Sequence, residues 1–380
     1  MTMAITRRDF LRNGTLASTL ASAPALAQAT AATSITEGAP LVTENVAKSA
    51  RHTNFYLSAA AANATPIIFL HGWPELSISW RHQLPVLAGL GFHTIAPDMR
   101  GYGRSGVYTR HEDYAIEQSV ADMIELLDAI GAEKAIWIGH DKGSGVVWSL
   151  AQHYPERCHG VASLTVPYLP NGLTAEHNAA LANRTLYPED KFPVAQWDYQ
   201  LFYRENFDAA RMAFEKNVRA TVKWLFRAGD PGGKGHPALT SMVRANGGWF
   251  GPGSGAPDLP RDERVLTQDD ENSYVAALQR NGFFGPDSWY MNDDANAAYA
   301  ASAKANWRLT MPVLFVHAAY DYVLDTLDSH LAEPMRVNCT NLTEATVFSG
   351  HWINQEQPFA INAAVANWLA VQFPALWLAR

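Results

Sequence analysis

The sequence predicts an α/β fold in which a doubly wound, mostly parallel sheet is interrupted by a helical insertion. Short apolar runs, typical of buried parallel strands, alternate with helical segments in the first half of the chain. Helical patterns then dominate the middle, and strand patterns return near residue 313. The 380 residues are 48% hydrophobic and 17% charged, enough for a large core, and the net charge of −8 argues against a nucleic-acid-binding surface.

Four buried strands are expected before the insertion, with helices between them. The strands are predicted at 66–70, 92–96, 135–139 and 161–166, and the helices at 80–90, 114–130 and 144–154. Gly131 and Pro155 mark the ends of the last two helices. Because strands and helices alternate, we expect parallel strands with helices on both faces.

The middle of the chain is predicted to be a helical cap. Its helices are expected at 195–206, 208–226 and 268–281, and the Gly- and Pro-rich segment 229–260 is expected to be a long loop with one short helix. Strands return at 313–317 and 346–348, before a last helix at 358–371. The expected domains are two parts of one core, 30–167 and 307–380, and a cap at 168–306.

Residues 1–29 resemble a twin-arginine export signal. Arg7 and Arg8 precede a weakly apolar run at 14–23, and the small residues of 25–29 offer a cleavage site. The run is too short and too polar to anchor the chain in a bilayer. We therefore expect a periplasmic or secreted bacterial protein without a membrane anchor; the alternative is an Ala-rich disordered tail.

The two cysteines, Cys158 and Cys339, are too few for a metal site or a disulfide framework. A bridge between them is conceivable in an oxidising compartment. Two unrelated, half-buried thiols are the favoured interpretation. The oligomeric state is left open by the sequence.

The segment Gly139–Gly143 has the G-x-nucleophile-x-G pattern of a sharp turn between a strand and a helix. Asp141 occupies the nucleophile position, where the helix dipole favours an anion. A carboxylate that attacks a saturated carbon leaves an alkyl ester, which water can cleave, whereas a serine would leave a stable ether. Asp141 therefore predicts attack on sp³ carbon; the alternative role is a helix cap.

A second motif, His71-Gly72-Trp73-Pro74, directly follows the first predicted strand. The backbone N–H groups of Trp73 and Lys142 are expected to form an oxyanion hole for the ester intermediate. The side chains of Trp73 and Pro74 are expected to form one wall of the pocket. The alternative is a simple tight turn.

His351 follows a predicted strand and is the expected base that activates water. Asp321 lies just beyond the strand at 313–317, where a carboxylate could orient the imidazole; Asp325 and Asp328 are the alternative acids. The order Asp141, Asp321, His351 is the nucleophile–acid–base order of one large hydrolase fold.

Two glycine-rich segments suggest nucleotide binding only weakly. Residues 101–106 match the G-x-G-x-x-G pattern but follow the second strand and begin inside a loop, and 232–235 lacks most of a phosphate-binding loop. We expect neither a metal nor an organic cofactor.

Together these motifs resemble the epoxide hydrolase branch of the α/β-hydrolases. The matching segments are 71–74, 97–105, 139–144 and 350–352, and the resemblance covers nearly the whole chain from about residue 45. It implies an α/β-hydrolase fold with a helical cap inserted after the sixth strand, and a small-molecule epoxide as substrate. It also implies that His71, Pro74 and Trp352 line the substrate site.

The resemblance further implies two cap tyrosines, Tyr199 and Tyr290, that act as acids on the epoxide oxygen. Their surroundings, 198–201 and 281–290, resemble those of the family's tyrosine pair. An epoxide opens to an alkoxide, a poor leaving group, so phenol donors are needed to protonate its oxygen. For each tyrosine the alternative is a half-buried aromatic side chain of the cap.

Two other functions share these motifs. Haloalkane and fluoroacetate dehalogenases also use an aspartate nucleophile, but the residue after it is typically Trp or Arg, where this chain has Lys142. A catalytically inactive binding module is the second alternative, although it would have no need to keep all these residues together. The sequence favours epoxide hydrolysis to a vicinal diol.

Overall fold

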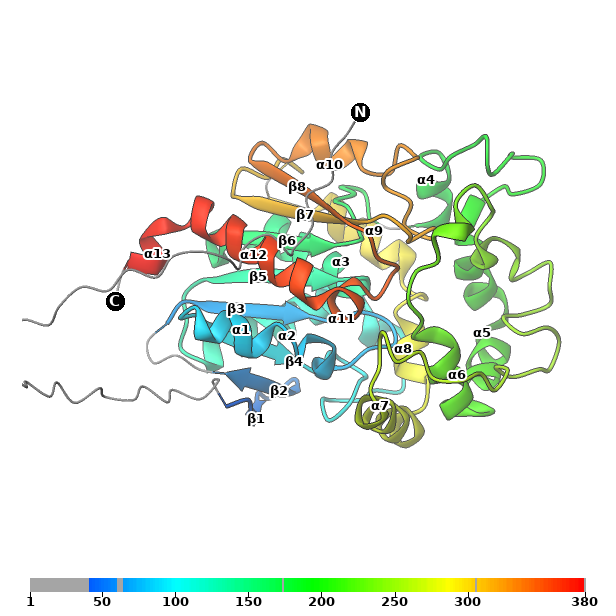
Figure 1. Cartoon of the computed structure of the whole chain (residues 1–380), viewed down its shortest axis with the longest axis horizontal. Helices are drawn as coiled ribbons and strands as arrows, with labels where there is room; N and C mark the ends of the chain where they lie inside the picture. Colours follow the sequence, from blue (N-terminus) through cyan, green and yellow to red (C-terminus); the bar gives the residue numbers. More distant parts are fainter. Residues whose placement is uncertain (1–40, 60–63, 173, 305, 379–380) are drawn as a thin grey trace, which may run out of the picture. The chain divides into compact units, whose positions relative to one another are not determined.

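The computed structural model describes residues 41–59, 64–172, 174–304 and 306–378, and the expected export signal at 1–29 lies outside them. The predicted doubly wound sheet is confirmed: eight strands form one sheet with helices on both faces (Figure 1). The strands are β1 (Thr43–Lys48), β2 (Thr53–Ala59), β3 (Pro66–Leu70), β4 (His93–Pro97), β5 (Ala135–His140), β6 (Cys158–Leu164), β7 (Val313–Ala318) and β8 (Leu342–Val347).

The strand order is β1-β2-β4-β3-β5-β6-β7-β8. Strands β3 to β8 pair in parallel, whereas β1 and β2 are antiparallel and form one edge. From β3 the chain first crosses to β4 on one side and then to β5 on the other. The loops after β3 and β5 therefore diverge at a switch point, where ligands bind in folds of this class.

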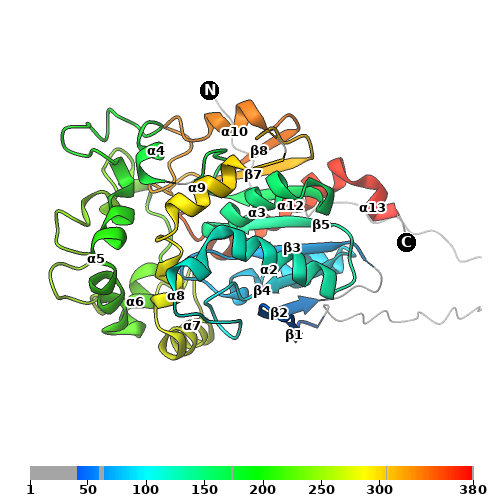
Figure 2. The same ribbon diagram turned by 180° about the vertical axis from the view of Figure 1, so that it is seen from behind.

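Helices cover both faces of the sheet because its parallel strands are apolar on both sides. Alternate residues of β3 point to opposite faces: Ile67 and Phe69 belong to one apolar core, Ile68 and Leu70 to another. Helices α1 and α12 lie on the face seen in Figure 1, and α2 and α3 on the face seen in Figure 2. The helices of this part are α1 (Leu84–Gly89), α2 (Ile116–Ala129), α3 (Lys142–His153), α10 (Glu333–Asn338), α11 (Ile353–Glu356), α12 (Pro358–Gln372) and α13 (Pro374–Leu378), with short 3₁₀ turns at Ser77–Trp80, His111–Tyr114 and Pro155–Arg157.

The cap helices lie between β6 and β7 in the chain and gather at one end of the sheet (Figure 1). They are α4 (Ala175–Ala179), α5 (Asp198–Glu215), α6 (Val218–Leu225), α7 (Gln268–Asn281), α8 (Phe284–Ser288) and α9 (Asp293–Ala301), with 3₁₀ turns at Ala195–Trp197, Pro231–Gly233 and Leu239–Met242. The break expected near residue 207 is a kink within α5, at Asn206 (φ −143°, ψ 47°). The segment 229–260 is a long loop with two short 3₁₀ turns.

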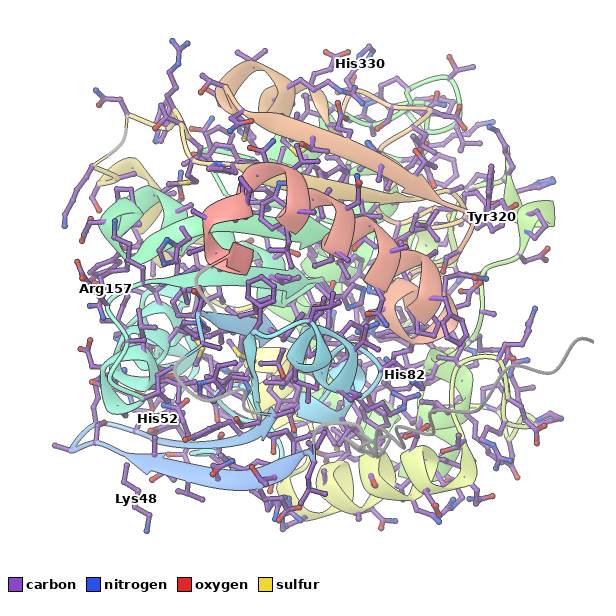
Figure 3. The ribbon with its side chains drawn as sticks, turned by 60° about the vertical axis from the view of Figure 1, so that its left-hand side comes forward. Lys48, His52, His82, Arg157, Tyr320 and His330 are labelled. Atoms are coloured by element: carbon purple, nitrogen blue, oxygen red, sulfur yellow. The ribbon has the colours of Figure 1, made fainter. Side chains whose placement is uncertain are left out.

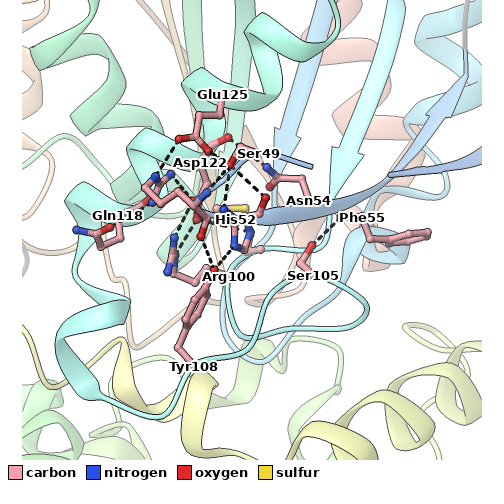
Figure 4. A network of polar contacts seen from close by, with 12 residues as sticks. Ser49, His52, Asn54, Phe55, Arg100, Ser105, Tyr108, Gln118, Asp122 and Glu125 are labelled. Atoms are coloured by element: carbon pink, nitrogen blue, oxygen red, sulfur yellow. Dashed lines mark hydrogen bonds and ion pairs between the residues drawn. The ribbon is translucent and has the colours of Figure 1, made fainter. Parts of the chain in front are cut away.

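A buried cluster of charges joins the loop after β4 to α2 (Figure 4). The Arg100 guanidinium donates two hydrogen bonds to the Asp122 carboxylate, at 2.7 and 2.8 Å, and Arg51 pairs with the same carboxylate. The backbone oxygen of Arg100 accepts a bond of 3.1 Å from the Trp289 indole in the cap. The cluster thus anchors a core loop that also supports the cap.

Cys158 and Cys339 are free thiols, and both are buried rather than half-buried as expected. Among the described residues, no helix combines the length and the apolar character that crossing a bilayer requires.

Candidate active site

Asp141 lies at the sharp turn between β5 and α3, in a strained backbone conformation (φ 48°, ψ −126°). Few residues other than glycine adopt a positive φ, and such strain concentrates at functional sites. The turn fits because its neighbours lack side chains: a Cβ on Gly143 would lie 2.2 Å from the Leu70 oxygen, and one on Gly139 would lie 2.6 Å from the Cα atom of Ser144. Close packing of the turn against the end of β3 therefore accounts for Gly143, and close packing of β5 against the start of α3 accounts for Gly139.

The two oxygens of the Asp141 carboxylate have different partners. Oδ1 accepts a hydrogen bond of 2.7 Å from the backbone N–H of Trp73, one of the two expected oxyanion donors. Oδ2 lies 3.6 Å from Nε2 of His351. Among the described residues, the N–H of Trp73 is the one hydrogen-bond donor to this carboxylate, and the N–H of Lys142, the second expected donor, makes no such bond. One oxygen is thus held by the backbone and the other faces the imidazole.

The expected acid Asp321 contacts His351 directly. Its Oδ2 lies 2.7 Å from Nδ1 of the imidazole, while its Oδ1 accepts hydrogen bonds from the backbone N–H groups of Val323 and Leu324. The alternative acid Asp325 instead accepts bonds from two backbone amides of its own loop. Asp321 is therefore the carboxylate that orients the ring.

The imidazole of His351 lies between two carboxylates. Burial alone lowers its pKa, but the charge and hydrogen bond of Asp321, with the charge of Asp141, outweigh burial and raise the pKa of His351 to about 9. Burial raises the pKa of Asp321, but contact with His351 more than offsets this and holds that pKa below its ordinary value. At neutral pH the resting site thus holds an imidazolium.

A buried glutamate–histidine pair beneath the site was missed by the sequence analysis. Glu75 Oε2 lies 2.7 Å from Nδ1 of His140 and accepts a bond of 2.9 Å from the N–H of Gly72. Burial raises the pKa of Glu75, but His140 outweighs it and lowers this pKa to about 2. Glu75 directly follows Pro74 of the first motif, and His140 directly precedes Asp141. Their positions beside the predicted site residues could have indicated a role in the site.

The two predicted cap tyrosines lie together. The rings of Tyr199, in α5, and Tyr290, just after α8, are 5.6 Å apart at an angle of 78°. Tyr290 is also stacked on Tyr203, with ring centroids 4.7 Å apart and planes within 5°. Burial raises the pKa of Tyr199 and Tyr290, so both phenols keep their protons over the physiological range and can donate hydrogen bonds.

The carboxylate of Asp141, the imidazole of His351 and both phenols line one cavity of about 590 Å³. It is lined by Asp141, His351, Tyr199, Tyr290, Trp73 and Trp352, among others. Tyr320 also lines it, at the end of the sheet that faces the cap (Figure 3). The wall of the cavity combines aromatic and other apolar residues with a smaller number of polar groups, as in small-molecule sites.

Two of the three residues expected to bind substrate, His71 and Pro74, are not among the described residues that line this cavity. His71 is fully buried, and its Nε2 accepts a hydrogen bond of 2.8 Å from the N–H of Met99. Its ring therefore holds the loops after β3 and β4 together. The expectation that His71 and Pro74 line the substrate site is therefore corrected. A sequence motif places residues along the chain but does not indicate which way each side chain points.

Several cap residues of the cavity wall were not predicted from the sequence. Trp224 and Trp249 line it, together with Arg227 and His236. The long loop predicted at 229–260 could have indicated some of these residues, because such loops in compact domains are usually functional.

Trp73 connects the core to the cap. Its indole N–H donates a hydrogen bond of 2.9 Å to Asp287.

Comparison with known proteins agrees with this geometry. The alpha/beta hydrolase fold family matches residues 65–358. Epoxide hydrolase A of Mycobacterium tuberculosis is 32% identical over 319 residues, which are 82% of this chain and 92% of the relative. This chain is an α/β-hydrolase of the epoxide hydrolase family.

Other relatives of this α/β-hydrolase carry similar names. Bifunctional epoxide hydrolase 2 of Sus scrofa is 32% identical over 80% of this chain, which spans only about half (51%) of that longer protein. The crystal structure of Epoxide Hydrolase A from Mycobacterium thermoresistibile superposes with a TM-score of 0.70 and 32% identity, covering 87% of this chain and 98% of the other. Among the described residues of this α/β-hydrolase, no group of three or more His, Cys, Asp or Glu side chains is placed to hold a metal ion.

Proposed function

We propose that this α/β-hydrolase converts an epoxide to a vicinal diol through an alkyl ester on Asp141. One observation carries the proposal: the Asp141 carboxylate, held by the Trp73 amide at 2.7 Å, shares a single cavity with His351 and two cap phenols. The names of the relatives point to the same reaction.

In the first step, Oδ2 of Asp141 attacks a carbon of the epoxide. The ring C–O bond breaks, and its electron pair remains on oxygen, which takes a proton from Tyr199 or Tyr290. Oδ2 is the attacking oxygen because Oδ1 is occupied by the Trp73 amide. The product is an alkyl ester of Asp141 with a neighbouring hydroxyl group.

Formation of the ester removes the charge of Asp141, so His351 releases its resting proton to solvent and becomes a neutral base. In the second step, His351 takes a proton from water, and the resulting hydroxide attacks Cγ of Asp141. Oδ1 then carries the negative charge, which the N–H groups of Trp73 and Lys142 stabilise. The acyl C–O bond breaks, the imidazolium returns its proton to the leaving oxygen, and the diol departs. The proton left on the Asp141 carboxyl group restores the phenol that donated in the first step.

The phenol pair favours an epoxide over a halide as leaving group. A departing halide needs no proton, whereas an alkoxide does. Tyr199 and Tyr290 remain protonated because burial raises the pKa of each. Both also line the cavity that contains Asp141, as a proton donor to the epoxide oxygen must.

Intact mass spectrometry of a His351→Ala variant incubated with styrene oxide tests the proposal. Without the base, the ester should form and persist, adding the mass of one whole epoxide, and peptide mapping should locate it on Asp141. The matched control is Asp141→Asn in the same variant, which should acquire no adduct.

Absence of the adduct with styrene oxide and with a panel of aliphatic and aryl epoxides would contradict the proposal. The dehalogenase alternative predicts chloride or fluoride release from haloalkanes or fluoroacetate, measured with an ion-selective electrode. It also predicts that a combined Tyr199→Phe and Tyr290→Phe change leaves this release nearly intact, whereas epoxide opening should fall by at least 10²-fold, as for loss of a general acid.

A further inference from the structure

The side chain of Lys142 lies beside the ring of Tyr290. Its ammonium nitrogen is 3.8 Å from the centroid of that ring, and Tyr203 is stacked on the same ring at 4.7 Å. The two neighbours must occupy opposite faces, because an ammonium and a parallel ring at these distances would overlap on one face. Tyr290 is therefore held between a cation and an aromatic ring.

The ammonium of Lys142 has no carboxylate within ion-pair distance among the described residues. Burial lowers the pKa of Lys142 below its ordinary value, and the nearby charges of Asp293 and Asp141 offset only part of that decrease. The side chain is also absent from the described residues that line the 590 Å³ cavity. Lys142 does line a smaller cavity together with Asp141, Tyr199 and His351. Its ammonium nitrogen nevertheless lies over the ring of Tyr290, so the side chain is placed to act on that phenol.

We propose that Lys142 makes Tyr290 the stronger of the two proton donors to the epoxide oxygen. The inference rests on the proposed function. When the O–H bond of Tyr290 breaks and its proton passes to the epoxide oxygen, negative charge develops on the phenol. A cation over the ring face attracts the electron-rich ring, and it attracts a phenolate more strongly than a phenol.

The other surroundings of Tyr290 oppose this proton transfer. Burial raises the pKa of the Tyr290 phenol, and the negative charge of Asp141 raises it further. Lys142 provides the opposite influence from within van der Waals contact. Lys142 is thus a positioning residue that acts through Tyr290, while its backbone N–H has a separate role at Asp141.

A double-mutant cycle tests this action on the full-length enzyme. The variants are Lys142→Met, which keeps the length of the side chain without its charge, Tyr290→Phe, and the two combined. Rapid-quench mass spectrometry gives the rate of ester formation from styrene oxide, and thermal unfolding monitors folding. Lys142→Met should slow ring opening roughly tenfold, equivalent to about 1.4 kcal/mol, and less than twofold when Tyr290→Phe is already present.

A Lys142→Arg variant distinguishes charge from packing, because it should retain most of the ring-opening rate if the cation matters. Equal slowing by Lys142→Met in both backgrounds would overturn the inference while leaving the ester mechanism intact. Ring opening within twofold of wild type in Lys142→Met would overturn it as well. If Tyr290→Phe itself left ring opening unchanged, the acid role of Tyr290 in the proposed function would fail, and the inference with it.

Discussion

The ring of His140 holds the loop that carries His351: its Nε2 lies 2.7 Å from the backbone oxygen of His351. A carbonyl oxygen can only accept, so Nε2 of His140 must donate. Nδ1 of the same ring faces the ionised carboxylate of Glu75 at 2.7 Å. His140, the residue before Asp141, thus joins a buried carboxylate to the backbone of His351.

Replacing Glu75 with Gln should destabilise the protein by about 3 kcal/mol, because breaking a buried ion pair leaves its partner uncompensated. Activity should fall as the loop of His351 loses its support. Urea unfolding and steady-state turnover measure the two effects. Glu333→Gln is the matched control, since Glu333 also pairs with a histidine at 2.7 Å, but on the surface, and should change stability by less than about 1 kcal/mol. Equal stability losses in the two variants would contradict this account.

Hydrolysis of the ester should depend on pH through His351. The charge of Asp141 contributes to the raised pKa of His351, about 9 in the resting site, and ester formation removes that charge. The hydrolysis rate should therefore rise with pH to a plateau whose apparent pKa lies below 9. Stopped-flow measurements from pH 5 to 10 with styrene oxide give this value, and a midpoint at or above 9 would refute the argument.

The raised pKa of His351 should also make the free energy of unfolding depend on pH. Because the folded-state pKa of His351 lies above its ordinary value of 6.5, its ionic contacts contribute fully below pH 6.5 and are lost as pH rises through about 9. Wild type should lose stability in this alkaline window relative to His351→Ala, as measured by urea unfolding at pH 6 and pH 10. If wild type and His351→Ala lost equal stability between pH 6 and pH 10, the ionic contacts of His351 would not contribute to stability.

Changing Asp321 to Asn should slow ester hydrolysis by about 10³–10⁴-fold, because an amide no longer stabilises the imidazolium or selects the right tautomer. Ring opening should be less affected, so the ester should accumulate and be visible in the intact mass. Asp325→Asn is the control, because Asp325 does not contact His351 in the structure. Accumulation of ester in the control variant instead would assign the orienting role to Asp325.

Acid should destabilise the protein through His52, which lies in the charge cluster of Figure 4. Burial, with the charges of Arg100 and Arg51, lowers the pKa of His52 to about 3. Below pH 6.5 the unfolded chain binds a proton at His52 that the folded protein does not bind until about pH 3, so the free energy of unfolding should decrease across this range. Between pH 7 and pH 5 wild type should lose about 2 kcal/mol more than His52→Gln in urea unfolding. The exposed His330→Gln should keep the wild-type slope; equal slopes in all three proteins would contradict the prediction.

We propose that the chain is exported by the twin-arginine route. Changing Arg7 and Arg8 together to Lys should retain the precursor in the cytoplasm of a bacterial host, as judged by cell fractionation and immunoblotting. Wild type should yield a shorter periplasmic form, cleaved between about residues 25 and 30. Equal periplasmic levels of both proteins would contradict export by this route.

Much of the core could be predicted because its signals are local. The apolar runs of β3 to β7 and the glycines around Asp141 reflect burial and close backbone packing at their own positions. The sequence predicted that one helix ends at Asn206 and another begins at Asp208, whereas the structure has one helix, α5, with a kink at Asn206. Whether the backbone hydrogen bonds continue across such a kink depends on tertiary packing. The antiparallel strands β1 and β2 were not predicted, because β1 is a largely exposed edge strand and β2 mixes buried with partly exposed positions without regular alternation.

The sequence by itself determined the order of the elements in the fold and singled out Asp141 as the candidate nucleophile, because these follow from local pattern and from carboxylate chemistry. Only the tertiary structure decided which side chains face the cavity. In the folded protein the side chain of His71 is fully buried, Glu75 contacts His140 beneath the loop that carries His351, and the ammonium of Lys142 lies over the ring of Tyr290. The direction of a side chain depends on what packs around it from distant parts of the chain, and those neighbours exist only once the sheet and cap have come together.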